Sequence, residues 1–147
     1  MLIPAVDADT GEPVVFHRDS GIDLVDAVAA STSSGFGGPY RIDESRYING
    51  GYRRSENADL AAGCGRVLVL SPFGGRSRMP AEWGMDLATQ VRELRAGGSR
   101  VETVFPDAGA GDVFDANALD PSTRPQAARG GHDQGRALAE QVATIWH

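Results

Sequence analysis

A run of four consecutive apolar residues, at positions 67–70, restricts the fold of this chain more than any other feature. An unbroken Val-Leu-Val-Leu run is typical of a central strand that is covered on both faces. A helix is expected on either side of it, at residues 57–62 and 80–96, and a second strand follows at residues 100–105. Strands that alternate with helices favour an α/β fold, in which helices cover both faces of a parallel sheet.

The first half of the chain shows shorter elements. Thr10-Gly11 between two apolar segments predicts a hairpin of strands at residues 2–6 and 13–16. Asp23 can cap a helix at residues 23–31, whose apolar face comprises Leu24, Val25, Val28 and Ala29. Two further short strands are expected at residues 40–42 and 46–48, and a last helix at residues 126–146. Nothing divides residues 1–147 into two domains, so a single domain is expected.

A tight turn, Asn49-Gly50-Gly51, follows the strand that ends at Ile48. A turn at the end of a strand is where α/β folds place reactive groups. Asn-Gly is also simply a favourable turn dipeptide, so the pattern alone does not establish a site. The backbone of an asparagine that precedes glycine has little steric shielding, so the next amide nitrogen can attack the asparagine side chain. A mobile turn of this kind is therefore expected to deamidate slowly.

Charge and composition exclude some classes of function. The net charge is −6, which argues against nucleic acid as a partner and against adhesion to anionic lipid by charge alone. All 14 basic residues are arginine, so chemistry that needs a lysine is excluded. Cys64, the only cysteine, allows no intrachain disulfide. No signal peptide and no apolar run of membrane-spanning length is visible, so a cytoplasmic protein without a transmembrane segment is expected.

Other polar residues offer weaker candidate sites. Two loops are rich in acidic side chains, and solvated turns are favoured there over calcium binding; the residues are Asp7, Asp9, Glu12, Asp107, Asp112, Asp115 and Asp120, with the neutral Asn117 among them. Asp26 and Asp59 fall in expected helices, where solvated or capping roles are favoured. The three histidines, His17, His132 and His147, lack the neighbours that a zinc site or a catalytic triad requires in sequence. No metal and no cofactor is expected.

Several segments resemble the C-terminal half of bacterial patatin-like phospholipases, which are serine acyl hydrolases. Asn49-Gly50-Gly51, with the segment 57–61 after it, is similar to the family's Asp-Gly-Gly turn and the helix that follows. The hairpin with its turn at residues 7–12, the segment 24–31 and the segment 66–72 are similar to further parts of the family, as are residues 105–107 and the closing helix. The resemblance covers nearly the whole chain and implies a three-layer patatin-like α/β fold, of which residues 1–147 form the C-terminal part.

The resemblance implies a catalytic mechanism and also a defect in it. In the family the turn aspartate and a serine form a catalytic dyad, with the serine in a Gly-x-Ser-x-Gly sequence. This chain has Asn49 where the family has the aspartate, and no Gly-x-Ser-x-Gly sequence occurs in it. A carboxamide cannot take the serine proton as a carboxylate does. Gly74-Gly75-Arg76 is the nearest match to the family's glycine-rich oxyanion loop, but it follows a different strand and is expected to be a plain loop.

These observations lead to a functional expectation with one alternative. The chain is expected to be part of a lipid acyl hydrolase, a phospholipase or esterase of lipid degradation, that is inactive alone and acts on lipid esters only when a nucleophile-bearing N-terminal half completes it. The site comprises Asn49, Gly50 and Gly51. The alternative is a non-catalytic pseudoenzyme, or a lipid- or protein-binding module on the same scaffold. Because half of such a sheet leaves apolar faces and edges uncovered, self-association or a complementing chain is expected.

Overall fold

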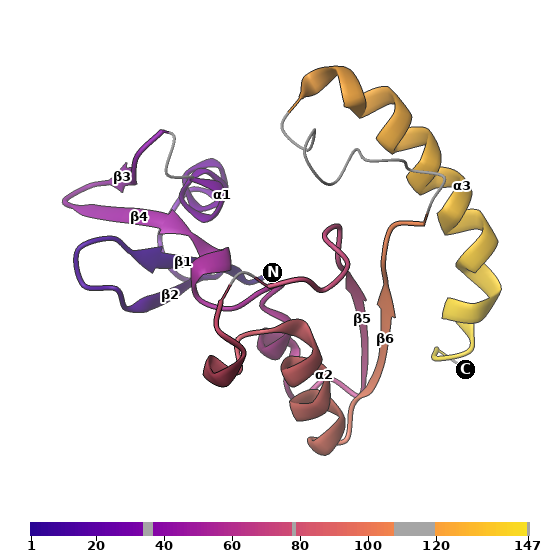
Figure 1. Cartoon of the computed structure of the whole chain (residues 1–147). Helices are drawn as coiled ribbons and strands as arrows, with labels where there is room; N and C mark the ends of the chain where they lie inside the picture. The colour runs from indigo at the N-terminus through magenta and orange to yellow at the C-terminus, as the bar shows by residue number, and fades with distance from the viewer. Residues whose placement is uncertain (34–36, 78, 108–119, 147) are drawn as a thin grey trace.

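The computed structural model of this chain shows two β-sheets, each with a helix packed on one face (Figure 1). It describes residues 1–33, 37–77, 79–107 and 120–146. The elements are β1 (Ile3–Asp7), β2 (Pro13–Phe16), α1 (Leu24–Thr32), β3 (Tyr40–Ile42), β4 (Ser45–Asn49), η1 (Gly50–Tyr52), η2 (Ala58–Ala61), β5 (Arg66–Leu70), η3 (Ala81–Trp83), α2 (Leu87–Ala96), β6 (Arg100–Val104), η5 (Pro121–Thr123) and α3 (Arg124–Ala143). The fold is therefore mixed α/β, as the sequence predicts in outline.

The first sheet is antiparallel, with strand order β2-β1-β4-β3. The predicted hairpin is confirmed, because β1 and β2 pair with Ile3 opposite Phe16. Helix α1 lies across this sheet, and its N-cap Asp23 accepts a hydrogen bond from the Val25 amide, as expected. A core of Ala5, Phe16, Ala27 and Ala30 fills the interface.

The apolar face predicted for α1 is the wrong one. The side chains of Leu24, Val25 and Val28 are exposed, and Val25 retains 73% of its surface. The buried residues are instead Ala27 and Ala30. Small side chains let the helix axis approach the sheet closely, and the larger residues then face solvent. An apolar patch on α1 thus remains uncovered among the described residues.

The second sheet is a parallel pair, β5 and β6, with Val67 opposite Val101. The alternation of strand, helix and strand predicted this pair correctly. Helix α2 packs on one face only, where Val67 and Val69 are buried with Leu94. Leu70 keeps 67% of its surface exposed.

Two predictions about the sheets therefore need correction. Helices were expected on both faces of β5, but in the described part of the chain only one face is covered. No residue of α3 is buried, and α3 contacts β6 through polar side chains, for example Gln141 Nε2 to Glu102 Oε1 at 2.8 Å. The expectation of a mostly parallel sheet is also wrong for these residues, because only β5 and β6 are parallel. Short hairpin turns join β1 to β2 and β3 to β4, and a turn that short can only connect antiparallel neighbours.

Helix α2 begins seven residues later than the sequence suggested, at Leu87 instead of position 80. Gly84 adopts a left-handed conformation with φ of 62° and ends the short turn η3. Asp86 then caps α2, because its Oδ1 accepts a hydrogen bond from the Thr89 amide at 2.8 Å. Trp83, which falls within the helix predicted at residues 80–96, lies in η3 instead and is exposed.

The other boundaries agree with the sequence to within a few residues. The strands at 66–70 and 100–105 appear as β5 and β6, and the segment 57–62 forms the 3-10 helix η2. Of the acidic loop, Asp112, Asp115 and Asn117 lie outside the described residues. None of the helices in the described part of the chain is both long and apolar enough to span a membrane.

The cap of α2 gives a stability prediction. Asp86→Ala should lower the free energy of unfolding by about 1 kcal/mol, because two hydrogen-bond donors of Thr89 lose their acceptor. Urea denaturation measures the loss. Asp86→Asn is the matched control and should cost less, since its one side-chain oxygen can still accept the hydrogen bond from the Thr89 amide and asparagine caps helices as well as aspartate does. An equal loss in both variants would mean that the charge of Asp86, and not its cap, stabilises the helix.

Candidate functional site

The turn predicted as the site lies at the end of β4, where Asn49 is the last strand residue and Gly50 begins η1. The structure brings Asn49, Gly50 and Gly51 together in one capped turn. The side-chain Oδ1 of Asn49 accepts a hydrogen bond from the Gly51 amide at 2.7 Å. The Asn49 amide donates to the Ser33 carbonyl at 3.0 Å, and the residue pairs with Ala5 of β1. The side chain of Asn49 is therefore held in one orientation at a strand end.

Only glycine fits at position 50, because β1 leaves no room there for a side chain. A Cβ atom on Gly50 would lie 2.3 Å from the Pro4 carbonyl oxygen. Real Cβ atoms do not approach a backbone oxygen so closely, and the residue is buried. The glycine thus lets β1 run directly against the turn, which fixes the turn from one side.

Asn57 holds the turn from the other side. Its Nδ2 donates to the Gly50 carbonyl oxygen at 2.9 Å, which also accepts a hydrogen bond from the Arg53 amide at 3.1 Å. Asn57 has a left-handed backbone, with φ of 52°. Asparagine tolerates this conformation better than most residues. The sequence predicts Asn57 only as the start of a helix, and it does not predict the contact of Asn57 with the turn.

Two arginines next to the turn form ion pairs with acidic residues of η2 and α2. Arg53 makes two hydrogen bonds with Asp59, at 3.0 and 2.6 Å, and a third with Asn57 Oδ1 at 2.9 Å. Arg54 binds Glu93 of α2 at 2.8 Å. The side chains of Arg53 and Asp59 are only 19% and 18% exposed. The expectation of a solvated or capping role for Asp59 is therefore wrong.

The ion pairs keep these carboxyl groups charged. Burial disfavours the charged form of Asp59, but the hydrogen bond from Arg53 and the charges of Arg53 and Arg54 outweigh burial and hold its pKa below the ordinary value. The hydrogen bond from Arg54 likewise lowers the pKa of Glu93. Neither group is therefore poised to exchange a proton near neutral pH. Asp26, the other acid considered, accepts a hydrogen bond from the Tyr40 hydroxyl at 2.8 Å.

A serine and a carboxylate that the sequence did not predict as partners lie close together at the end of β5. The Ser71 hydroxyl donates to Glu56 Oε1 at 2.6 Å and accepts from the Gly75 amide at 2.8 Å. Ser71 is 1% exposed, so no substrate can reach it in this conformation. Because the Gly75 amide is already bonded to Ser71, it does not serve as an oxyanion donor here. Glu56 and Ser71 are fifteen positions apart, and no local pattern in the sequence predicts such a contact.

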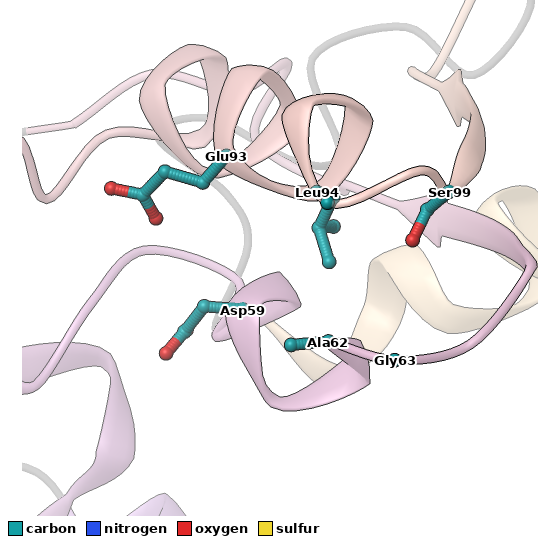
Figure 2. A pocket seen from close by; sticks show the side chains of 7 residues that line it. Asp59, Ala62, Gly63, Glu93, Leu94 and Ser99 are labelled. Carbon is teal, nitrogen blue, oxygen red and sulfur yellow. The ribbon is translucent and has the colours of Figure 1, made fainter.

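A small cavity of about 110 Å³ lies between η2 and α2. Figure 2 shows Asp59 and Glu93 on one side of it, Leu94 and Ala62 in the middle, and Ser99 at the other end. The two carboxylates are partnered by arginines, and the Ser99 hydroxyl donates to the Cys64 carbonyl at 2.7 Å. The cavity therefore presents no unpaired polar side chain for a ligand.

The remaining candidates contribute no assembled site. His132 contacts Asp133 at 3.2 Å and His17 lies 3.8 Å from Asp19, all on exposed side chains. His147 lies outside the described residues. Among the residues that the structure does describe, no three histidine, cysteine or acidic side chains cluster as metal ligands.

Comparisons with known proteins add no family assignment. No protein-family model matches this chain. A search of curated proteins also finds no match. The patatin-like interpretation therefore depends on the residues of the turn and its surroundings.

The fit of Gly50 against Pro4 gives a direct prediction. Gly50→Ala should lower the free energy of unfolding by about 2 kcal/mol or more, because β1 or the turn must move to admit the methyl group. The midpoint of urea denaturation measures this loss. Gly65→Ala is the matched control, since a Cβ there meets nothing within 4 Å. Equal stability of the two variants would contradict the close approach of β1 to the turn.

Proposed function

We propose that this chain is the C-terminal part of a patatin-like serine acyl hydrolase of lipid esters, with Asn49 at the position of the dyad aspartate, and that it is inactive alone. The observation that carries the proposal is the fixed orientation of the Asn49 side chain at the end of β4. One side-chain atom, Oδ1, is held by the Gly51 amide at 2.7 Å. The other, Nδ2, makes no hydrogen bond to the described residues, which leaves it available for a group that enters from outside.

An aspartate in this place would suit general-base chemistry. One carboxylate oxygen would take the hydrogen bond from Gly51, and the other would face an incoming serine hydroxyl. The carboxamide of Asn49 keeps the shape of that group but cannot accept the proton, a loss typically worth ~10²–10⁴ in rate. No Gly-x-Ser-x-Gly sequence occurs in the chain, and Ser71 is buried. For these reasons we propose that catalysis needs both a nucleophile from another segment and an aspartate at position 49.

Exposed apolar side chains favour a second candidate function, a non-catalytic module that binds a protein or a lipid. Leu24, Val25 and Val28 form a patch on α1, and Leu70 and Phe73 are exposed at the end of β5. Such patches often mark interaction sites. They would also suit self-association or a complementing chain, as a half-domain requires. The two functions differ in whether a nucleophile-bearing segment restores hydrolysis.

Ester hydrolysis tests the proposal. The purified chain should give no turnover of short-chain p-nitrophenyl esters above buffer and no labelling by a serine-directed fluorophosphonate. Hydrolysis that the fluorophosphonate abolishes would contradict it, because a competent serine would then be present.

A complementation assay separates the two candidate functions. With a patatin-like segment that carries the Gly-x-Ser-x-Gly sequence, Asn49→Asp should hydrolyse esters at least ~10²-fold faster than the original chain. Asn49→Ala is the control and should stay inactive. If the assembled Asn49→Asp protein remains as slow as Asn49→Ala, position 49 is not the dyad position and the binding module is favoured.

A further inference from the structure

An Asn-Gly sequence such as Asn49-Gly50 can deamidate without an enzyme. The Gly50 amide nitrogen can attack Cγ of Asn49; the bond from Cγ to the side-chain nitrogen breaks and ammonia leaves. Water then opens the five-membered imide at one of its two carbonyl groups and gives aspartate or isoaspartate. The reaction needs no cofactor, but it requires the Gly50 nitrogen to approach the Asn49 side chain.

The backbone of Asn49 is turned away from this geometry. Its ψ is 129°. Ring closure requires the Gly50 nitrogen to eclipse Cβ, which corresponds to ψ of about −120° because the substituents of a tetrahedral Cα lie about 120° apart. The Gly50 peptide must therefore rotate by about 110° about the Cα–C bond. The hydrogen bond from the Gly51 amide to Asn49 Oδ1 also fixes the side chain in its present place.

Contacts on Gly50 oppose that rotation. Its Cα packs against the Pro4 carbonyl of β1 so tightly that a methyl group would not fit. Its carbonyl oxygen accepts two hydrogen bonds, one from the Arg53 amide and one from Asn57 Nδ2. The Arg53 bond lies inside the turn and can move with it, whereas Asn57 is seven residues away from Gly50.

Asn57 is itself held firmly. Its Oδ1 accepts a hydrogen bond from Arg53 Nη1, and the same guanidinium binds both oxygens of Asp59. The backbone of Asn57 is left-handed, and its amide donates to the Ser55 carbonyl at 2.6 Å. The donor that restrains Gly50 thus lies outside the turn, and the partly buried ion pair of Arg53 with Asp59 holds it in place.

We propose that Asn49 is a deamidation site that the folded turn protects from reaction. The side chain of Asn57 provides this protection through its hydrogen bond to the Gly50 carbonyl oxygen. Loss of the Asn57 contact frees the Gly50 peptide to rotate and lets Asn49 convert to aspartate or isoaspartate. The aspartate product places a carboxylate where the chain now has a carboxamide. This inference does not depend on the proposed enzymatic function, because it concerns the chemistry of the turn alone.

Mass spectrometry of the tryptic peptide 47–53 after incubation at mildly alkaline pH tests the inference. The synthetic peptide of the same sequence gives the unprotected rate. The native chain should deamidate at least about tenfold more slowly than this peptide, and Asn57→Gly at least about tenfold faster than the native chain, the factor expected for the loss of one good hydrogen bond. Glycine is chosen because it adopts the left-handed backbone of position 57 freely.

Two further variants separate local release of the turn from general unfolding. Asn57→Asp keeps the acceptor for Arg53 but loses the donor to Gly50, and should deamidate as fast as Asn57→Gly. Val101→Ala weakens the core under β6, away from the turn, and should deamidate at the native rate. The inference is overturned if the native chain reacts as fast as the peptide, if neither Asn57 variant is faster than the native chain, or if Val101→Ala is accelerated as much as they are.

Discussion

The contacts of Gly50, at its Cα and at its carbonyl oxygen, are the ones on which the arrangement of the turn depends. On one side the backbone of β1 lies so close that only glycine fits, and on the other side Asn57 donates a hydrogen bond to the carbonyl oxygen. These contacts join the antiparallel sheet to the segment that leads to β5. The side chain of Arg53 donates hydrogen bonds to both Asn57 and Asp59, so the turn and η2 form one connected hydrogen-bond network. A change at any member is expected to reach Asn49.

The same network explains why the acidic residues near the turn are structural. An isolated charge in a partly buried position would be costly, and the bidentate arginine pair with Asp59 offsets that cost. The pair keeps the carboxylate ionised and occupied, which leaves it unsuited to proton transfer. Position 49 is different, because the side chain there has one atom held and one atom without a partner among the described residues. This contrast is the reason to place the proposed chemistry at Asn49.

The sequence predicted the elements better than their packing. Strand β5 was predicted to within one residue, because an apolar run between Gly65 and Ser71 permits few alternatives. The large apolar residues of α1 can be recognised from the sequence, but their spacing does not determine which side of the helix packs on the sheet. Ala27 and Ala30 are the residues buried there, because small side chains let the helix lie closer to the sheet. The turn at the end of β4 could be located from Asn49-Gly50-Gly51 alone. The contact of Asn57 with the turn, and the separate Glu56–Ser71 contact, depend on left-handed backbones and on residues distant in sequence, which no local pattern encodes.

Hydrogen exchange at the Gly51 amide is the most direct test of a turn held rigid from both sides. Gly51 is exposed, so its amide is protected only if the hydrogen bond to Asn49 Oδ1 persists. The Gly51 and Arg53 amides should exchange slowly in the native chain, and both should lose protection in Asn57→Gly, while the amides of β5 and β6 keep theirs. If the native Gly51 amide exchanges at the rate of an unstructured peptide, the Asn49 side chain has no fixed position and the turn is not rigid.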